Sequence, residues 1–422
     1  MSSRLLRAVL LVALMSILMI APGAWGQREY KTLYKFTQDK DGGTPLAGLT
    51  FAPTGELYGT TFTGGDAFGT VFRLTPQPDG RWMESTIYTF RQIGYNVGGL
   101  ILDDARSLYG TTYEGGTYGG GVVFKLSPKL GGSWTESVLY NFCSLANCLD
   151  GGASRAGLIF DADGSLYGTT FEGGTNGWGV VFKLKHNKDG GWSETVLHRF
   201  TQDDGQWPAG ALVLDRQGNL YGTTVNGGSG GCQFGCGVVF ELIPSVNGDW
   251  KEKVLHRFTA GSDGSLPFSS LIFDKAGNLY GTTTAGGNSG CNGSGCGVAF
   301  RLAPNSDGSW KETILHRFTG GKDGAVPYAG LILDKTGNLY GSAMGGGDTS
   351  CHRRDYIPGC GVVFRLTPDS AGKWRETVLH EFRNHPGDDP WGGLIFDTMG
   401  NLYGTTFGDN SSTFGSVFEI TP

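Results

Sequence analysis

Acidic and aromatic side chains recur together in the segments that separate the apolar runs of this chain. In each case an Asp, followed by Gly or Pro, precedes a large aromatic residue by two to five positions. The set comprises Asp204 with Trp207, Asp263 with Phe268, Asp323 with Tyr328, and Asp389 with Trp391. Carboxylates beside flat rings can bind a sugar or a cation. Alternatively, each Asp forms a turn and each ring caps the core, and the repetition of the pattern favours this second interpretation.

The same carboxylates are candidates for the acid and the base of an enzyme. Asp204 and Asp323 would serve a hydrolase or lyase that acts on an extracellular polysaccharide, provided that their side chains converge. The chain shows no recognisable Ser, His and Asp order, no His-rich metal set and no phosphate loop. We therefore identify no catalytic residue and favour a non-catalytic protein. We predict no metal site and no cofactor; calcium, which Asp and backbone carbonyl oxygens can bind, is the alternative.

The eight cysteines form four local pairs. The pairs are Cys143 with Cys148, Cys232 with Cys236, Cys291 with Cys296, and Cys351 with Cys360. An even number of cysteines in an exported chain favours disulfides, and pairing within one loop is the simplest connectivity. Such small loops would each contribute only about 2 kcal/mol, so the bridges would stiffen loops rather than hold the fold together. Zinc is the competing interpretation, but the paired two-residue spacing of zinc sites is absent.

A tandem repeat must position these residues. The string Leu-Tyr-Gly occurs seven times, with its Tyr at 58, 109, 167, 221, 280, 340 and 403. The intervals of 51 to 63 residues suit four short strands with loops of variable length. In the third unit we predict strands over 157–161, 166–170, 179–184 and 194–200, each bounded by Gly-rich or polar turns.

The strands predict a closed ring. Runs such as Val362-Val363-Phe364 are apolar on both faces, as in radially packed blades. The seventh unit ends after its third strand, whereas residues 32–36 match a fourth strand and precede the first unit. We therefore predict an all-β, seven-bladed β-propeller of four-stranded blades, closed by pairing the N-terminal strand with the C-terminal blade. It spans 27–422, with breaks between blades near 44, 95, 153, 207, 266, 326 and 390.

Several sequence blocks recur in the same order in the units. They are Leu-Tyr-Gly-Thr-Thr, Gly-Gly, Gly-Val-Val-Phe-Lys-Leu and Trp-x-Glu-x-Val-Leu-x-x-Phe. This set resembles the Gloeo/Verruco tandem repeat of secreted bacterial proteins over essentially the whole of 27–422. The resemblance implies secretion and a repeat architecture, and it implies no activity.

The N-terminal segment predicts export, and the net charge limits the expected partners. Arg4 and Arg7, an apolar run over 8–21 and the small residues before 26 form a secretory signal peptide over 1–26. No second apolar run follows, so we expect no membrane span after cleavage. The formal net charge of −6, without a basic cluster, argues against nucleic acid as a partner. We expect a bacterial monomer, exported to the periplasm or the medium.

The residues thus favour a non-catalytic binding or interaction module for a carbohydrate or an envelope protein. Its site would lie on the face that carries the connections between blades, at the eight Asp and aromatic residues above. The alternatives are the polysaccharide-acting hydrolase or lyase and a purely structural component of the envelope.

Overall fold

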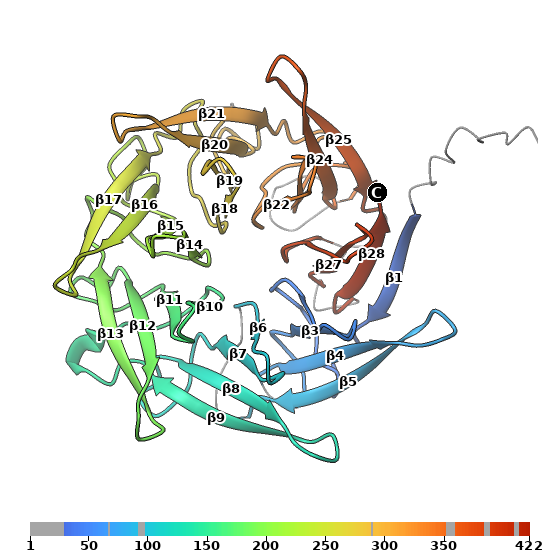
Figure 1. The fold of residues 1–422 in the computed structure, drawn as a ribbon. Coiled ribbons are helices and arrows are strands. Elements are labelled where there is room, and N and C mark those ends of the chain that lie inside the picture. Colours follow the sequence, from blue (N-terminus) through green and yellow to red (C-terminus); the bar gives the residue numbers. More distant parts are fainter. Residues whose placement is uncertain are drawn as a thin grey trace, which may run out of the picture.

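A computed structural model of the chain shows a ring of seven blades around a central channel (Figure 1). The structure describes residues 29–65, 68–91, 98–287, 290–351, 359–383, 389–408 and 413–422. The predicted signal peptide (1–26) and the predicted break near 95 lie outside these ranges. The prediction of a seven-bladed propeller is confirmed: each blade is a four-stranded antiparallel sheet.

Each blade runs outward from the channel in the order of its strands, except for the last blade, which β1 completes. The innermost strands are β2 (Thr50–Phe51), β6 (Ile101–Leu102), β10 (Ile159–Phe160), β14 (Val213–Leu214), β18 (Ile272–Phe273), β22 (Ile332–Leu333) and β26 (Ile395–Phe396). The second strands are β3 (Leu57–Thr60), β7 (Leu108–Thr111), β11 (Leu166–Thr170), β15 (Leu220–Thr224), β19 (Leu279–Thr283), β23 (Leu339–Ala343) and β27 (Leu402–Thr406).

The third strands are β4 (Thr70–Pro76), β8 (Val122–Pro128), β12 (Val180–His186), β16 (Val238–Pro244), β20 (Val298–Pro304), β24 (Val362–Pro368) and β28 (Ser416–Thr421). The outer strands are β5 (Trp82–Thr89), β9 (Trp134–Asn141), β13 (Trp192–Arg199), β17 (Trp250–Arg257), β21 (Trp310–Arg317), β25 (Trp374–Glu381) and β1 (Glu29–Lys35). A single helical turn, η1 (Ala146–Cys148), occurs among the described residues. In these same ranges, no helix is both long and apolar enough to cross a membrane.

The ring closes through the N-terminal strand. β1 pairs antiparallel with β28, from Glu29 opposite Thr421 to Lys35 opposite Ser416, and the two lie side by side in Figure 1. A second link lies nearer the channel, where the Thr405 hydroxyl donates to the Ala47 carbonyl at 3.1 Å. The last blade therefore contains both ends of the propeller, and the sheet edge that it would otherwise expose is covered.

The Gly of Leu-Tyr-Gly is required by packing within the blade. At Gly281 a Cβ atom would come 2.7 Å from Cζ of Phe300, the large residue of the third strand. The same Phe occupies this place in all seven blades and is fully buried in each of them. Absence of a side chain, rather than an unusual backbone conformation, thus leaves room for the tip of this ring against the second strand.

The core lies between blades rather than within one sheet. One cluster joins Tyr221 and Val239 of the fourth blade to Leu271, Val298 and Phe300 of the fifth. The Trp that begins each outer strand, except in the last blade, packs toward the Leu-Tyr-Gly tyrosine of the preceding blade; Trp310 and Tyr221 have ring centroids 6.2 Å apart. This accounts for strands that are apolar on both faces.

Candidate functional site

A cavity of about 670 Å³ opens at the end of the channel where the chain passes from one blade to the next. We call it the mouth cavity. Small residues before each innermost strand form its wall, and they are small because neighbouring blades meet closely there. A Cβ on Gly210 would lie 2.6 Å from the carbonyl oxygen of Ser269 in the next blade. The cavity thus needs larger side chains from elsewhere to contact a ligand.

Three aromatic rings supply part of that contact surface. Phe268, Tyr328 and Trp391 line the mouth cavity from the fifth, sixth and seventh blades, and we call them the aromatic arc. The centroids of Phe268 and Tyr328 are 4.9 Å apart, and those of Tyr328 and Trp391 are 4.4 Å apart with the planes inclined by 21°. Phe407 lies behind Trp391 at 5.5 Å. All three rings of the arc are half-buried, so each keeps some surface exposed.

The arc departs from the symmetry of the ring. Its residues occupy one position of the repeat, directly after Pro267, Pro327 and Pro390 at the entries to the fifth, sixth and seventh blades. The same position holds Leu46 in the first blade, Arg155 in the third and Ala209 in the fourth. The residue at this position is not needed to build the blade, because residues as different as Ala, Arg and Trp occupy it.

The backbone that presents the arc is held by the preceding blade. Leu266 and Val326, two residues before Phe268 and Tyr328, have positive φ angles of 58° and 55°. This left-handed conformation is unfavourable for branched side chains, above all for Val. Their N–H groups donate to the carbonyls of Cys236 and Cys296 at 2.9 Å in both cases. Hydrogen bonds from a neighbouring loop therefore hold the strained residues.

The predicted disulfides are confirmed, and two of them lie in the loops that hold the arc. The bonds join Cys143 to Cys148, Cys232 to Cys236, Cys291 to Cys296, and Cys351 to Cys360. The last three occupy the loop between the second and third strands of the fourth, fifth and sixth blades. Each of these loops precedes a blade that contributes a ring to the arc. The disulfides thus stiffen the surface from which the aromatic side chains project.

A single charged side chain lines the described part of the mouth cavity. Arg155, from the third blade, is exposed, and its guanidinium lies 5.0 Å from the centroid of Tyr113 and 4.1 Å from that of Phe171. Phe171 in turn stacks on Trp207 with centroids 5.7 Å apart and planes inclined by 16°. The predicted rim residue Trp207 therefore supports Arg155 through Phe171. Cation–π contacts of this kind hold an arginine in place while its N–H groups remain available.

Sequence reasoning missed the residues after Leu-Tyr-Gly-Thr-Thr. Phe62, Tyr113, Phe171 and Phe407 occupy this position in four blades. Phe62 and Tyr113 line the mouth cavity, whereas Phe171 and Phe407 support Arg155 and Trp391. The signal was present, because the corresponding residues in the other blades are Val225, Thr284 and Met344. An aromatic residue that alternates with small or aliphatic ones at one repeat position marks a place where the blades differ in chemistry.

Three of the four predicted aspartates, Asp204, Asp263 and Asp323, do not line the mouth cavity. Asp323 accepts hydrogen bonds from the Thr319 N–H at 2.9 Å and from the Thr319 hydroxyl, and it lies 3.1 Å from Nε2 of His316 on the outer strand. Asp263 has the same arrangement with Thr259 and His256, and Asp204 with Thr201 and His198. These carboxylates close the loops between blades, as the turn interpretation predicts.

The pKa values of Asp204 and Asp323 agree with this role in their own loops. Burial alone would raise the pKa of Asp204 and of Asp323, but the neighbouring imidazole and the Thr N–H and hydroxyl groups lower both pKa values below the ordinary range. Asp204 and Asp323 lie in different junctions, each bound within its own loop. Neither lines the mouth cavity, so they do not form an acid and base pair there.

Asp389 differs from the other three. It is buried, and its carbonyl accepts a hydrogen bond from the Phe407 N–H at 2.7 Å, which links it to the ring behind Trp391. No group of three or more His, Cys, Asp or Glu within the described ranges could hold a metal ion. The described lining of the mouth cavity thus consists of aromatic rings, small residues and one guanidinium. Such a set can bind and orient a ligand, and it contains no carboxylate to transfer a proton.

The chain is similar to solved structures at low sequence identity. The extracellular domain of a protein assigned as a one-component system of B. thetaiotaomicron aligns with a TM-score of 0.51 and 11% identity, over 92% of this chain. This chain spans only 39% of the length of that protein chain. A protein of Thermus thermophilus assigned as an oxidoreductase, a glucose dehydrogenase, aligns with a TM-score of 0.44 and 16% identity over 94% of this chain and 100% of the other. The first likeness shows the fold alone.

The repeat itself identifies the family. No curated protein sequence matches the chain. The model of the Gloeobacter/Verrucomicrobia repeat matches residues 133–354, which is more than half of the chain and lies in the second to sixth blades. The matched blocks are those that build the blades: the second-strand Leu-Tyr-Gly, the apolar third strand and the outer strand that begins with Trp. The chain therefore belongs to the Gloeobacter/Verrucomicrobia repeat family.

Proposed function

We propose that this protein is an exported, non-catalytic binding module that holds a saccharide at the mouth cavity. The observation that carries the proposal is the break in symmetry at one repeat position. Three consecutive blades place Phe268, Tyr328 and Trp391 there, and another blade places Arg155 there. Aromatic faces suit the apolar faces of sugar rings, and a guanidinium suits their hydroxyl or carboxylate oxygens.

The dimensions of the mouth cavity agree with a small ligand or the end of a longer one. Its volume of about 670 Å³ lies within the usual range for pockets that bind small molecules. The half-buried rings are already packed against each other, so little side-chain entropy is lost on binding. The neutral wall of small residues leaves Arg155 as the group that would orient a polar ligand.

Export is supported by the disulfides. Four disulfides among the described residues are typical of a protein that folds in an oxidising compartment. The calcium alternative and the hydrolase or lyase alternative receive no support from the arrangement of the aspartates described above. An envelope protein as ligand stays an alternative that the same experiment addresses.

The test is a binding screen followed by a matched pair of substitutions. The purified protein is titrated with a panel of neutral and acidic oligosaccharides and with envelope protein extracts. Tyr328→Ala removes the central ring of the arc, whereas Tyr118→Ala removes an exposed tyrosine that does not line the mouth cavity. We expect Tyr328→Ala to weaken saccharide binding by about 2 kcal/mol, the usual effect of a central aromatic contact, and Tyr118→Ala to leave it unchanged. Equal affinities of both variants for every bound saccharide would contradict the proposal.

A further inference from the structure

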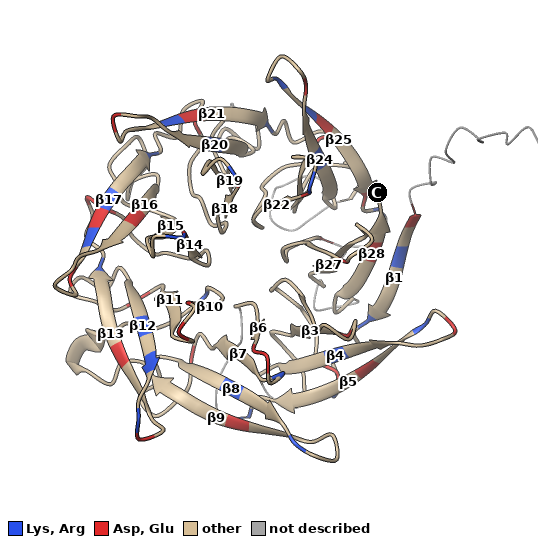
Figure 2. Ribbon diagram, in the orientation of Figure 1, with Lys and Arg blue, Asp and Glu red and all other residues tan. Residues whose placement is uncertain are grey.

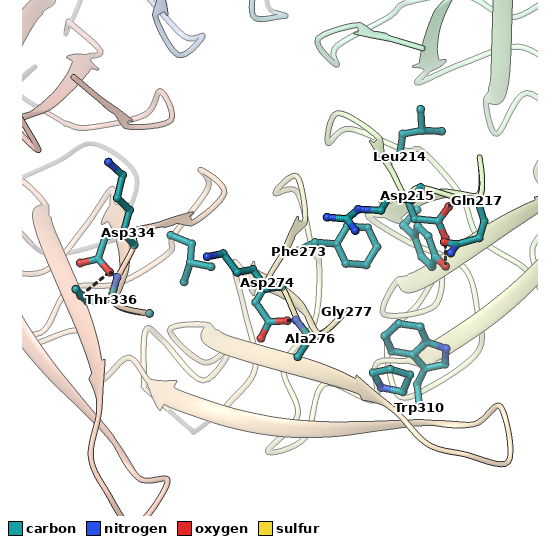
Figure 3. A pocket seen from close by; sticks show the side chains of 17 residues that line it. Leu214, Asp215, Gln217, Phe273, Asp274, Ala276, Gly277, Trp310, Asp334 and Thr336 are labelled. Carbon is teal, nitrogen blue, oxygen red and sulfur yellow. Dashed lines mark hydrogen bonds between the residues drawn. The ribbon is translucent and has the colours of Figure 1, made fainter. Parts of the chain in front are cut away.

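A second and larger cavity lies at the opposite end of the channel. Its volume is about 1160 Å³, and the turns between the first and second strands of the fourth, fifth and sixth blades surround it. We call it the hairpin cavity. Figure 3 shows Asp215, Asp274 and Asp334, one from each of these three turns, with Phe273 and Trp310 among the side chains that line it. Because strands alternate in direction, these turns lie at the face opposite the mouth cavity.

The three turns share a cation at one repeat position where the other blades have none. The residue after the conserved Asp is Arg216, Lys275 or Lys335 in the fourth, fifth and sixth blades. The corresponding residues in the first, second, third and seventh blades are Pro53, Asp104, Ala162 and Thr398. All three cations line the hairpin cavity and are exposed. Repetition alone does not explain them, since four of seven units do without a cation at this place.

The neighbouring carboxylates do not form ion pairs with these cations. Asp274 accepts from the N–H groups of Ala276 and Asn278, from the side-chain amide of Asn278 and from the Tyr280 hydroxyl, at 2.7 to 3.0 Å. Asp215 and Asp334 accept from equivalent donors in their own turns. None of the three cations forms an ion pair with any other described residue. The aspartates thus serve the turns, while the cations remain without a charged partner in the described ranges.

The hairpin cavity also offers apolar surface beneath the cations. Leu214, Phe273 and Leu333 end the innermost strands of the three blades, and Tyr221 and Trp310 lie between the fourth and fifth blades. A site for a single small anion would need convergent donors around one point. Here the cations stand on three successive turns, with flat and aliphatic surface between them.

We propose that the hairpin cavity binds a strand of acidic polysaccharide, whose carboxylates pair with Arg216, Lys275 and Lys335 while its sugar rings rest on the apolar floor. This site is independent of the mouth cavity. A polymer with charges at regular intervals can contact three turns at once, which gives multivalent binding from weak individual ion pairs. An acidic peptide would satisfy the charges but would not use the ring surfaces in the same way.

The experiment is a titration with hexagalacturonate, with maltohexaose as its neutral counterpart and hexaglutamate as the acidic peptide. The variant Arg216→Ala, Lys275→Ala, Lys335→Ala removes the three cations. The matched control Lys185→Ala, Lys251→Ala, Lys311→Ala removes three exposed lysines, one from the third strand β12 and two from the outer strands β17 and β21, with the same change in net charge. All six substitutions lie at exposed positions, so both variants should fold, which the melting temperature verifies.

We expect hexagalacturonate to bind the natural protein, maltohexaose to bind at least tenfold more weakly, and the first variant to lose at least tenfold in affinity for hexagalacturonate. The matched control should lose less than threefold, and higher salt should weaken binding of the natural protein. Equal losses in the two variants, or no binding of hexagalacturonate, would overturn the site. Hexaglutamate binding as tightly as hexagalacturonate would overturn the assignment to a saccharide. Tyr328→Ala should not change this titration, which separates its outcome from that of the mouth cavity.

Discussion

The blade interiors and the channel mouth follow opposite rules. In the blade interiors one residue type recurs at the central packing position: the third-strand Phe lies against the Leu-Tyr-Gly glycine in all seven blades. At the channel mouth, the repeat position that holds the aromatic arc is Leu46, Arg155, Ala209 or Trp391 in different blades. Repetition identifies what builds the ring. Departures from repetition identify the surface that is free to bind something.

The charged residues where neighbouring outer strands meet resemble the blade interiors, because the same residue types recur there from blade to blade. In six blades the outer strand carries a Glu two residues after its Trp, and the acidic residues recur along β5, β9, β13, β17, β21 and β25 in Figure 2. At one junction, Glu312 and Asp263 each lie 3.6 Å from Nε2 of His256. Charged groups can thus be structural when they repeat, which is why their abundance alone does not indicate a site.

The largest effect should come from breaking the repeated interior. Phe300→Ala removes a fully buried ring that fills the space above Gly281 and contacts Phe258 at 5.3 Å between centroids. We expect the free energy of unfolding to fall by about 3 to 5 kcal/mol, as for other buried aromatic residues. Saccharide affinity at a temperature where the variant is folded should stay within twofold of the natural value. Chemical denaturation measures the stability of the variant, and titration measures its saccharide affinity. A large loss of affinity with little loss of stability would show that the blade interior, rather than the channel mouth, determines binding.

An intermediate effect should come from the junction glutamates and depend on pH. Burial, followed by the nearby Asp263, raises the pKa of Glu312 to about 8, and burial raises that of Glu252 to about 7. Below the ordinary pKa of Glu both folded and unfolded states hold the proton. As pH rises toward 8 the unfolded state releases it while the folded state retains it, so the contribution of Glu312 to stability decreases.

Glu312→Gln removes this dependence. We expect the variant to match the natural protein near pH 4 and to be more stable by about 1 kcal/mol above pH 8, where the folded protein must hold a buried charge. The control is Glu114→Gln, at an exposed position. Melting temperatures from pH 4 to 9 provide the measurement. A Glu312→Gln variant that is less stable at high pH would show that the carboxylate forms a favourable ion pair there.

The smallest effect on saccharide binding should come from Trp207. This residue does not line the mouth cavity and acts on it only through Phe171 and Arg155. Trp207 stacks on Phe171, and Phe171 lies 4.1 Å from the guanidinium of Arg155. Trp207→Ala should therefore weaken saccharide binding by about 0.5 to 1 kcal/mol. Trp207→Phe, which keeps a stacking ring, should restore most of the affinity. If the Phe variant binds as weakly as the Ala variant, Trp207 does not position Arg155 by stacking.

Much of the fold was predictable because the same strand pattern occurs in seven units of the sequence. The strand order, the closure by residues 32–36 and the local disulfides all follow from patterns that are short in sequence. The site was predictable only in part. Phe268, Tyr328 and Trp391 were identified, but Asp204, Asp263 and Asp323 were grouped with them because they are close in the chain. Closeness along the chain does not decide which side of a loop a side chain occupies, and each of these carboxylates binds back to its own loop.

Two features depend on contacts between neighbouring blades, and sequence reasoning did not find those contacts. Arg155 meets Tyr113 from the second blade and Phe171 from its own. The cations of the hairpin cavity stand 59 and 60 residues apart in the sequence, and they matter only because three adjacent blades place them around one space. A search for repeat positions that change chemistry would have found both.

The central claim is that the departure from repetition at the channel mouth forms the binding site. The most direct test is a crystal structure of the protein with the tightest saccharide from the binding screen. We predict a sugar ring stacked on Tyr328 or Trp391, with an oxygen within hydrogen-bond distance of Arg155. A saccharide bound at the equivalent junctions between blades, repeated around the ring and away from the aromatic arc, would contradict the account.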